Sequence, residues 1–193
     1  MNRIKIATLS IVLASCVVTD DEIKEVETLK VGMSTGIVQG YVSDSAADVV
    51  AWDDIPFAQP PVGDLRWRAP RPLEASSQII RSKDDTACVQ KASVYGGVVG
   101  EGVVGSEDCL YLDVKAPADF KDKDYPVMFW IHGGGNTTGL KDFYDYSRLV
   151  ALKDVVVVST NYRLGGLGWF SHPAIQDHQA GVGKSRHVWT LDL

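Results

Sequence analysis

Two continuous apolar segments constrain the fold of this chain more than any other feature of its sequence. Residues 127–131 read VMFWI and residues 155–158 read VVVV, without alternation between apolar and polar side chains. Strands of this kind need cover on both faces, which is typical of a parallel sheet beneath helices. Apolar residues of the intervening segment 144–152 fall near helical spacing. The sequence therefore predicts a strand, a helix and a parallel strand joined by a right-handed crossover.

Shorter β-like segments come before this unit. Residues 36–42 and 49–52 flank the turn-prone residues 43–45, and together they predict an antiparallel hairpin. Residues 110–114, with the sequence LYLDV, predict a further strand. The fold class is therefore α/β, with a hairpin in front of the central sheet. The 193 residues suffice for one domain with a hydrophobic core.

The beginning of the chain resembles an export signal. Arg3 and Lys5 precede the apolar run 6–14, which is too short to span a bilayer as a helix. The run leads into LASC at residues 13–16, which is similar to the bacterial lipoprotein box, where cleavage precedes a lipidated cysteine. An ordinary signal peptide with a chance cysteine is the alternative. Lipid on Cys16 predicts an exported lipoprotein held at the outer membrane or the periplasmic face.

The sequence predicts three regions: a signal peptide over residues 1–15, a polar tether over 16–35, and one domain over 36–193.

Apart from the cysteine of the export signal, the chain has Cys88 and Cys109. An exported compartment permits a disulfide between them, and two free buried thiols are the alternative. Closing this loop would stabilise the fold by ~3 kcal/mol in the chain-entropy picture.

Charge and residue spacing argue against several classes of function. The formal net charge is −6 and the chain has no basic cluster, which argues against a nucleic-acid partner. The four histidines show no metal-ligand spacing, and the sequence predicts neither a metal nor a cofactor. Ser34 lies in a formal G-x-S-x-G pattern, but a polar segment precedes it where a nucleophile elbow needs a strand. Residues 181–185 resemble the end of a phosphate-binding loop but follow no predicted strand.

A glycine-rich segment, HGGG at residues 132–135, directly follows the first apolar strand. Three consecutive glycines cost backbone entropy, so a special conformation or a close approach of the main chain to a ligand must require them. In serine hydrolases such a loop directs backbone N–H groups at the oxyanion of a tetrahedral intermediate. A glycine-rich turn without chemistry is the alternative.

Five short motifs occur in order along the chain. They read IPFAQPPVG at 55–63, LRW at 65–67, SEDCLYL at 106–112, WIHGGG at 130–135 and NYRLG at 161–165. In this order they resemble the type-B carboxylesterase and cholinesterase family, and the resemblance covers about residues 36 to 170. It implies an α/β-hydrolase fold, of which this chain holds the N-terminal part: the hairpin and the start of the mostly parallel central sheet. It also implies hydrolysis of carboxylic esters by acyl transfer to a serine.

The resemblance implies roles for the glycine loop. Gly134 and Gly135 would donate their amide hydrogens to the oxyanion, and His132 would hold the loop. Asn136 stands where the family often has an aromatic residue, so the contact on the acyl side differs. A neutral and fairly small ester is the implied substrate, because the loop between the two later cysteines has Tyr95 as its only aromatic residue. Cholinesterases carry a tryptophan there that binds the choline cation.

The resemblance also implies structural contacts. The two later cysteines match a family disulfide that closes an Ω-type loop. Arg66 and Glu107 match a family salt bridge, expected to lie buried beneath that loop. Arg163 matches a second structural arginine, for which Asp192 is the candidate partner.

The nucleophile, base and orienting carboxylate of the family come later than residue 193, and no acceptable nucleophile elbow occurs before it. The chain is therefore predicted to be a truncated carboxylesterase that is inactive alone. A non-catalytic, cholinesterase-like binding protein and a non-functional remnant are the alternatives. Truncation further predicts that the strand over 127–131 leaves an apolar edge unpaired, which favours aggregation.

Overall fold

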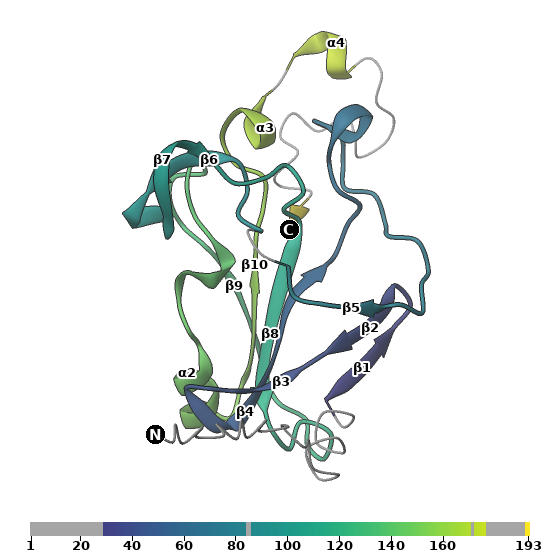
Figure 1. Ribbon diagram of the computed structural model, residues 1–193, viewed down its shortest axis with the longest axis vertical. Coiled ribbons are helices and arrows are strands. Elements are labelled where there is room, and N and C mark those ends of the chain that lie inside the picture. The colour runs from purple at the N-terminus through teal and green to yellow at the C-terminus, as the bar shows by residue number, and fades with distance from the viewer. Residues whose placement is uncertain (1–28, 84–85, 171, 177–191) are drawn as a thin grey trace, which may run out of the picture.

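The structure is a computed structural model that describes residues 29–83, 86–170, 172–176 and 192–193. The strands in this part of the chain are β1 (Lys30–Met33), β2 (Gly36–Gln39), β3 (Tyr41–Ser43), β4 (Ala46–Pro56), β5 (Ile79–Ile80), β6 (Gln90–Ser93), β7 (Val98–Val104), β8 (Tyr111–Pro117), β9 (Val127–Ile131) and β10 (Val156–Thr160). The central sheet has the strand order β3-β4-β8-β10-β9. A three-stranded sheet, β1-β2-β5, and a two-stranded sheet, β6-β7, lie on either side of it in Figure 1.

Helices in the described part of the chain are short, and none is long and apolar enough to cross a bilayer. The α-helices are α2 (Ser147–Lys153), α3 (Gly165–Trp169) and α4 (Pro173–Gln176), and the 3-10 turns are η1 (Gly63–Leu65), η2 (Val94–Gly96) and η3 (Lys141–Phe143). In Figure 1, α2 lies at one end of the central sheet, whereas α3 and the β6–β7 hairpin lie at the other. The loops that follow β9 and β10 therefore meet at the end of the sheet that carries the hairpin.

The predicted strand–helix–strand unit is confirmed. β9 and β10 pair in parallel, with Val127 opposite Val156 and Ile131 opposite Thr160, and α2 connects them. Val150 of α2 is fully buried against the sheet, and burial of a valine side chain contributes roughly 1.5–3 kcal/mol. The strand predicted over 110–114 is also confirmed as β8, which pairs antiparallel with both β4 and β10. The fold class is thus α/β.

The predicted N-terminal hairpin is correct only in its second half. β3 pairs antiparallel with β4, but the segment expected to form one strand over 36–42 breaks at Gly40, and β2 belongs to the smaller sheet. A Cβ atom on Gly40 would lie 2.5 Å from the indole nitrogen of Trp52. That nitrogen and the Gly40 amide both donate to the carbonyl oxygen of Leu29. The chain therefore bends tightly over the indole and leaves the central sheet.

The boundary predicted for the polar tether lies too late in the chain. Lys30–Met33, placed in the tether over 16–35, form β1 and pair antiparallel with β2. Leu29 and Val38 join Trp52 in a core cluster under this small sheet, which explains why the segment folds although it is short. The signal peptide and the first part of the tether lie outside the described residues.

β9 forms an exposed apolar edge of the central sheet. Val127 is 64% exposed and Phe129 is 53% exposed. The expectation that both faces of this strand are covered is therefore wrong for the described part of the chain. The reason is that α2 packs mainly over β4 and β8. An apolar strand at an edge presents unpaired N–H and C=O groups that another chain can pair with.

We expect the 193-residue chain, expressed alone, to self-associate through β9. Phe129→Lys should shift it toward monomer, because a charge on an edge strand opposes strand pairing between chains. Leu152→Lys is the matched control, since Leu152 is 77% exposed on α2, away from the edge. Size-exclusion chromatography with light scattering measures the outcome. A wild-type chain that is a monodisperse, cooperatively melting monomer would contradict the prediction.

Candidate oxyanion site

The glycine loop forms a tight turn directly after β9. The backbone φ angles of Gly134 and Gly135 are +103° and +62°, values that residues with side chains rarely adopt. The carbonyl oxygen of Gly134 accepts hydrogen bonds from the amides of Thr137 and Thr138, each at 3.2 Å. A Cβ atom on Gly134 would lie 1.9 Å from the carbonyl oxygen of Thr138. Glycine at this position is therefore a requirement of the turn itself.

Two amide groups of the turn have no hydrogen-bond acceptor. Among the described residues, neither Gly134 nor Gly135 donates its amide hydrogen to an acceptor. A Cβ atom on Gly133 or Gly135 would meet no heavy atom within 4 Å, so open space lies next to the loop. Amide donors that are fixed in direction and adjacent to open space are what an oxyanion hole requires.

The side chain of His132 is buried and packs against the turn. Its ring is buried, with 4% of the residue exposed, and stacks on Tyr162 with ring centroids 4.3 Å apart and planes at 14°. Its Nδ1 lies 2.9 Å from the carbonyl oxygen of Gly133, and because that oxygen can only accept, Nδ1 carries the proton. Burial lowers the pKa of His132, so the ring is neutral near pH 7. The Tyr162 hydroxyl donates to the His132 carbonyl at 2.9 Å, which ties the loop to the end of β10.

A buried ammonium, which was not predicted from the sequence, holds the far end of the loop. Lys141 is 1% exposed, and its Nζ lies 2.8 Å from one carboxylate oxygen each of Asp54, Asp113 and Asp142. The Lys141 amide also donates to the Asn161 side chain at 2.9 Å. Breaking such a buried pair typically costs about 3–5 kcal/mol. The cluster therefore joins β4, β8 and the end of β10 to the residues that follow the glycine turn.

The carboxylates of this cluster differ in their pKa values. Burial raises the pKa of Asp113 to about 8, and the hydrogen bond with Asp142 adds to this, so that together they outweigh the attraction of Lys141. Burial acts in the same direction on Asp54, but hydrogen bonds from Lys141 and Ser82 prevail and lower its pKa overall. One sequence signal was available: Asp113 interrupts the apolar strand segment 110–114.

The structure bonds Cys88 to Cys109, with an S–S distance of 2.07 Å, and both residues are buried. The chain between them is not the irregular Ω-type loop expected from the resemblance, because β6 and β7 within it form an antiparallel hairpin. Tyr95 at the tip of this hairpin is 91% exposed. Gly96 is buried against the turn, where an added Cβ atom would lie 2.8 Å from Cβ of Thr138.

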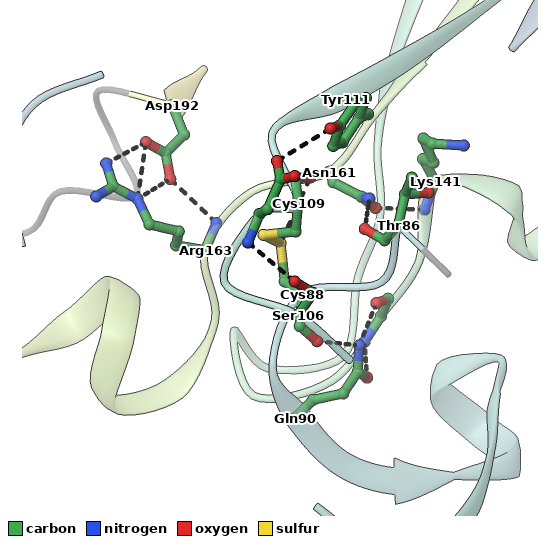
Figure 2. Close-up of a disulfide and its surroundings, with 12 residues drawn as sticks. Thr86, Cys88, Gln90, Ser106, Cys109, Tyr111, Lys141, Asn161, Arg163 and Asp192 are labelled. Atoms are coloured by element: carbon green, nitrogen blue, oxygen red, sulfur yellow. Dashed lines mark hydrogen bonds and ion pairs between the residues drawn. A yellow bond between two sulfur atoms is a disulfide. The ribbon is translucent and has the colours of Figure 1, made fainter. Parts of the chain in front are cut away.

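Two arginines bind carboxylates, and the two pairs differ in burial. Arg66 Nε lies 2.5 Å from Oε2 of Glu107, but the side chains are 38% and 25% exposed. The expectation of a buried pair is therefore wrong, and solvent screening leaves a pair this accessible with little effect on stability. Arg163 Nε lies 2.9 Å from Oδ2 of Asp192, and these side chains are 4% and 0% exposed (Figure 2). The candidate partner of Arg163 thus lies in contact with it.

Asn136 and Cys16 are the remaining residues that the sequence singled out. Asn136 follows the glycines with a φ of +60°, and its carbonyl oxygen accepts the amide of Gly165 at 2.8 Å. It therefore lies in the main-chain framework that joins the turn to α3. Cys16 lies outside the described residues.

A parallel β9–β10 pair, an antiparallel β8 beside it and a glycine turn at the end of β9 are together typical of part of an α/β-hydrolase fold. Among solved structures, a thermophilic PNB esterase matches with a TM-score of 0.71 and 33% sequence identity, over 84% of this chain and 32% of that chain. The model of the Carboxylesterase family matches residues 27–181. The chain belongs to the carboxylesterase family.

Relatives in this family include enzymes from animals and bacteria. The cocaine esterase of Oryctolagus cuniculus is 43% identical over 151 residues, which cover 71% of this chain and 28% of that protein. The fumonisin B1 esterase of Sphingopyxis macrogoltabida is 40% identical over 157 residues, which cover 80% of this chain and 28% of that protein. The chain therefore spans somewhat more than a quarter of the length of these relatives, in their N-terminal region.

We expect Asp113→Asn to flatten the pH dependence of folding stability. The folded pKa of about 8 lies above the ~3.9 of an unfolded aspartate, so the folded state holds a proton that the unfolded state has lost. The contribution of this group is therefore complete below about pH 4 and is lost as the pH rises toward about 8. Urea unfolding across that window, in the Phe129→Lys background, should show wild-type stability falling relative to Asp113→Asn. A difference that stays constant with pH would contradict this.

Proposed function

We propose that this chain supplies the oxyanion hole of a serine carboxylesterase, with the amides of Gly134 and Gly135 as its donors. One observation carries the proposal: among the described residues, these two amides have no acceptor, and open space lies beside Gly133 and Gly135 at the end of a parallel strand. The nucleophile, acid and base would come from the part of the fold that the relatives contain and this chain does not span.

The proposed chemistry is acyl transfer to a serine. The serine oxygen attacks the ester carbonyl, the carbonyl oxygen gains negative charge, and the alcohol leaves with a proton from the base. Water then repeats the attack on the acyl-enzyme and releases the acid. Each oxyanion donor typically stabilises the transition state by ~3 kcal/mol, because the dipoles are already oriented before the charge develops. A neutral His132 suits this role, since its buried ring orients the loop without adding a competing charge.

We propose a neutral, fairly small carboxylic ester as the substrate. Support comes from the hairpin between Cys88 and Cys109, whose only aromatic residue is Tyr95, with 91% of its surface exposed. A cation–π site for a quaternary ammonium needs an aromatic face directed into the pocket, and Tyr95 does not offer one. The names of the relatives, which include cocaine esterase, pyrethroid hydrolase and fumonisin B1 esterase, all describe enzymes that are not cholinesterases.

We also propose that the chain is exported and tethered to a membrane by lipid on Cys16. The short apolar run and the LASC pattern at residues 13–16 support this. An oxidising compartment would maintain the bond between Cys88 and Cys109. The outer membrane or the periplasmic face is the proposed location, because Val17 follows the cysteine where an aspartate would direct retention in the inner membrane.

We expect a chimera to reveal the oxyanion role. In it, residues 29–170 replace the matching segment of the fumonisin B1 esterase, whose remaining sequence provides the rest of the fold. The chimera should hydrolyse p-nitrophenyl acetate, and Gly135→Ala should lower its kcat by about 100-fold. The reason is that a methyl group at Gly135 enters the open space beside the amide and opposes its φ of +62°. The 193-residue chain alone should show no turnover above a heat-denatured control.

The matched control is Gly63→Ala. Gly63 has a similar φ of +54° and, like Gly135, no heavy atom within 4 Å of an added Cβ, but it lies in η1, outside the turn. Both variants therefore introduce the same backbone strain. Equal kcat values for the two variants would refute the oxyanion role of the turn.

We expect lipidation to depend on Cys16 alone. In a bacterial host that processes lipoproteins, the wild-type protein should fractionate with membranes and carry an acylated N-terminus by mass spectrometry. Cys16→Ser should remove both properties, because a single acyl chain already contributes ~0.8 kcal/mol per buried CH₂ to membrane binding. Cys109→Ser is the control that removes a cysteine and should stay in the membrane fraction. An unlipidated wild-type protein would rule out the anchor.

A further inference from the structure

The carboxamide of Gln90, the first residue of β6, is buried and uses all of its polar atoms. Its Nε2 donates to the carbonyl oxygen of Cys88 at 3.0 Å and to that of Gly139 at 2.8 Å. Its Oε1 accepts the amide of Gly139 at 2.8 Å. Only 4% of Gln90 is exposed, and Figure 2 shows its side chain reaching from the hairpin strand to these main-chain atoms. One side chain thus satisfies both polar main-chain groups of Gly139.

Gly139 packs against the first residues of the glycine turn. A Cβ atom there would lie 1.9 Å from Nδ1 of His132 and 2.7 Å from the carbonyl oxygen of Gly133. Its φ of +145° also excludes most side chains. The main chain of Gly139 therefore packs against the first residues of the turn. Any movement of Gly139 is transmitted to His132 and Gly133, and so to the two amides that follow.

The hairpin that carries Gln90 is itself fixed against the turn. Cys88, two residues earlier, is bonded to Cys109, and the amide of Ser106 donates to the carbonyl oxygen of Ala87 at 2.8 Å. At the other end of the hairpin, Gly96 packs on Thr138. The carboxamide is thus anchored to a rigid element that contacts the turn at two points.

We propose that Gln90 is a positioning residue for the oxyanion hole. Its carboxamide holds Gly139 and thereby sets the direction of the Gly134 and Gly135 amides. This rests on the proposed function, since it deepens the role of the same site. Gln90 touches no reacting atom and acts through Gly139 alone.

Isosteric substitutions separate the hydrogen bonds from simple packing. Gln90→Met keeps the length of the side chain and removes its hydrogen bonds. Gln90→Glu keeps an acceptor for the Gly139 amide but, when ionised, places negative charge against two carbonyl oxygens. A buried carboxyl has a raised pKa, so lowering the pH to about 5 should protonate it and restore one donor. The control is Gln78→Met, because Gln78 is exposed and directly precedes β5, in the sheet that does not carry the turn.

Hydrogen exchange read by mass spectrometry tests the structural half of the proposal on the 193-residue chain in the Phe129→Lys background. The amides of Thr137 and Thr138 bond to Gly134 and report on the turn without touching Gln90. In Gln90→Met, the amides of Thr137 and Thr138, resolved from that of Gly139 by overlapping peptides, should exchange about 10-fold faster, while peptides of β8 and β10 stay at wild-type rates. Gln90→Glu should exchange fast at neutral pH and return toward the wild-type rate at about pH 5, when each pH is compared with wild type.

The esterase chimera tests the functional half. Gln90→Met should lower kcat by about 10- to 100-fold and change KM by less than about 3-fold. The reason is that misdirected amides stabilise the transition state less but leave substrate binding nearly unchanged. Gln90→Glu should recover kcat, relative to wild type, as the pH falls. Gln78→Met should match wild type in both constants.

The outcomes distinguish this inference from the proposed function. If the Thr137 and Thr138 amides exchange no faster in Gln90→Met than in Gln78→Met, the positioning role is overturned, and a uniform increase over the whole sheet overturns it too. Faster exchange in the turn with unchanged kcat also overturns it. If the unsubstituted chimera has no activity that depends on Gly135, the proposed function fails, and the exchange measurement alone then decides whether Gln90 holds the turn.

Discussion

The contact on which the rest of the site depends is the steric closure of one backbone turn. Gly134 faces the carbonyl of Thr138, and Gly139 faces His132, each at a separation that leaves no room for a Cβ atom. Between these two points, Gly135 and Asn136 have positive φ angles, and the amides of Gly134 and Gly135 have no acceptor among the described residues. Because glycine loses more conformational entropy on folding than other residues, such a turn does not hold itself together. The surrounding elements must supply its stability.

Three groups of contacts supply it from different parts of the fold. Tyr162, after β10, stacks on His132 and bonds its carbonyl. The hairpin contributes Gln90, which bonds to Gly139. The buried ammonium of Lys141 pairs with Asp113 and so fixes the chain that follows the turn. Figure 2 shows Asn161 between Lys141 and Thr86, bonding both, which links the last two groups. A conformation unfavourable in isolation is thus over-determined by its neighbours, as strained functional sites generally are.

The sequence predicted the parts of this arrangement that local pattern encodes. Continuous apolar runs identified β9 and β10, and the glycines that follow β9 identified the turn. What it did not predict depends on contacts between distant residues. The break at Gly40 exists because an indole from β4 lies beneath it. Lys141 looks like a surface lysine until the fold brings Asp54 and Asp113 to it from 87 and 28 residues away. The hydrogen bonds between Gln90 and Gly139 join residues 49 positions apart, so no local sequence pattern indicates them.

The same reasoning explains why the exposed edge and the rigid turn occur on one strand. In the proposed site β9 must be stiff where it ends, because an error in the direction of its last peptide would misdirect the Gly134 and Gly135 amides. Pairing with β10 along its whole length gives that stiffness from one side, with Ile131 opposite Thr160 at the point where the turn begins. The other side of β9 stays apolar and exposed, with Val127 and Phe129 more than half accessible. Apolar residues at an edge fit burial beneath further structure, and the relatives, of which this chain spans somewhat more than a quarter, have the remaining length to provide it. The apolar side chains of β9 therefore fit burial in a larger sheet, and their exposure is a property of the described part of the chain.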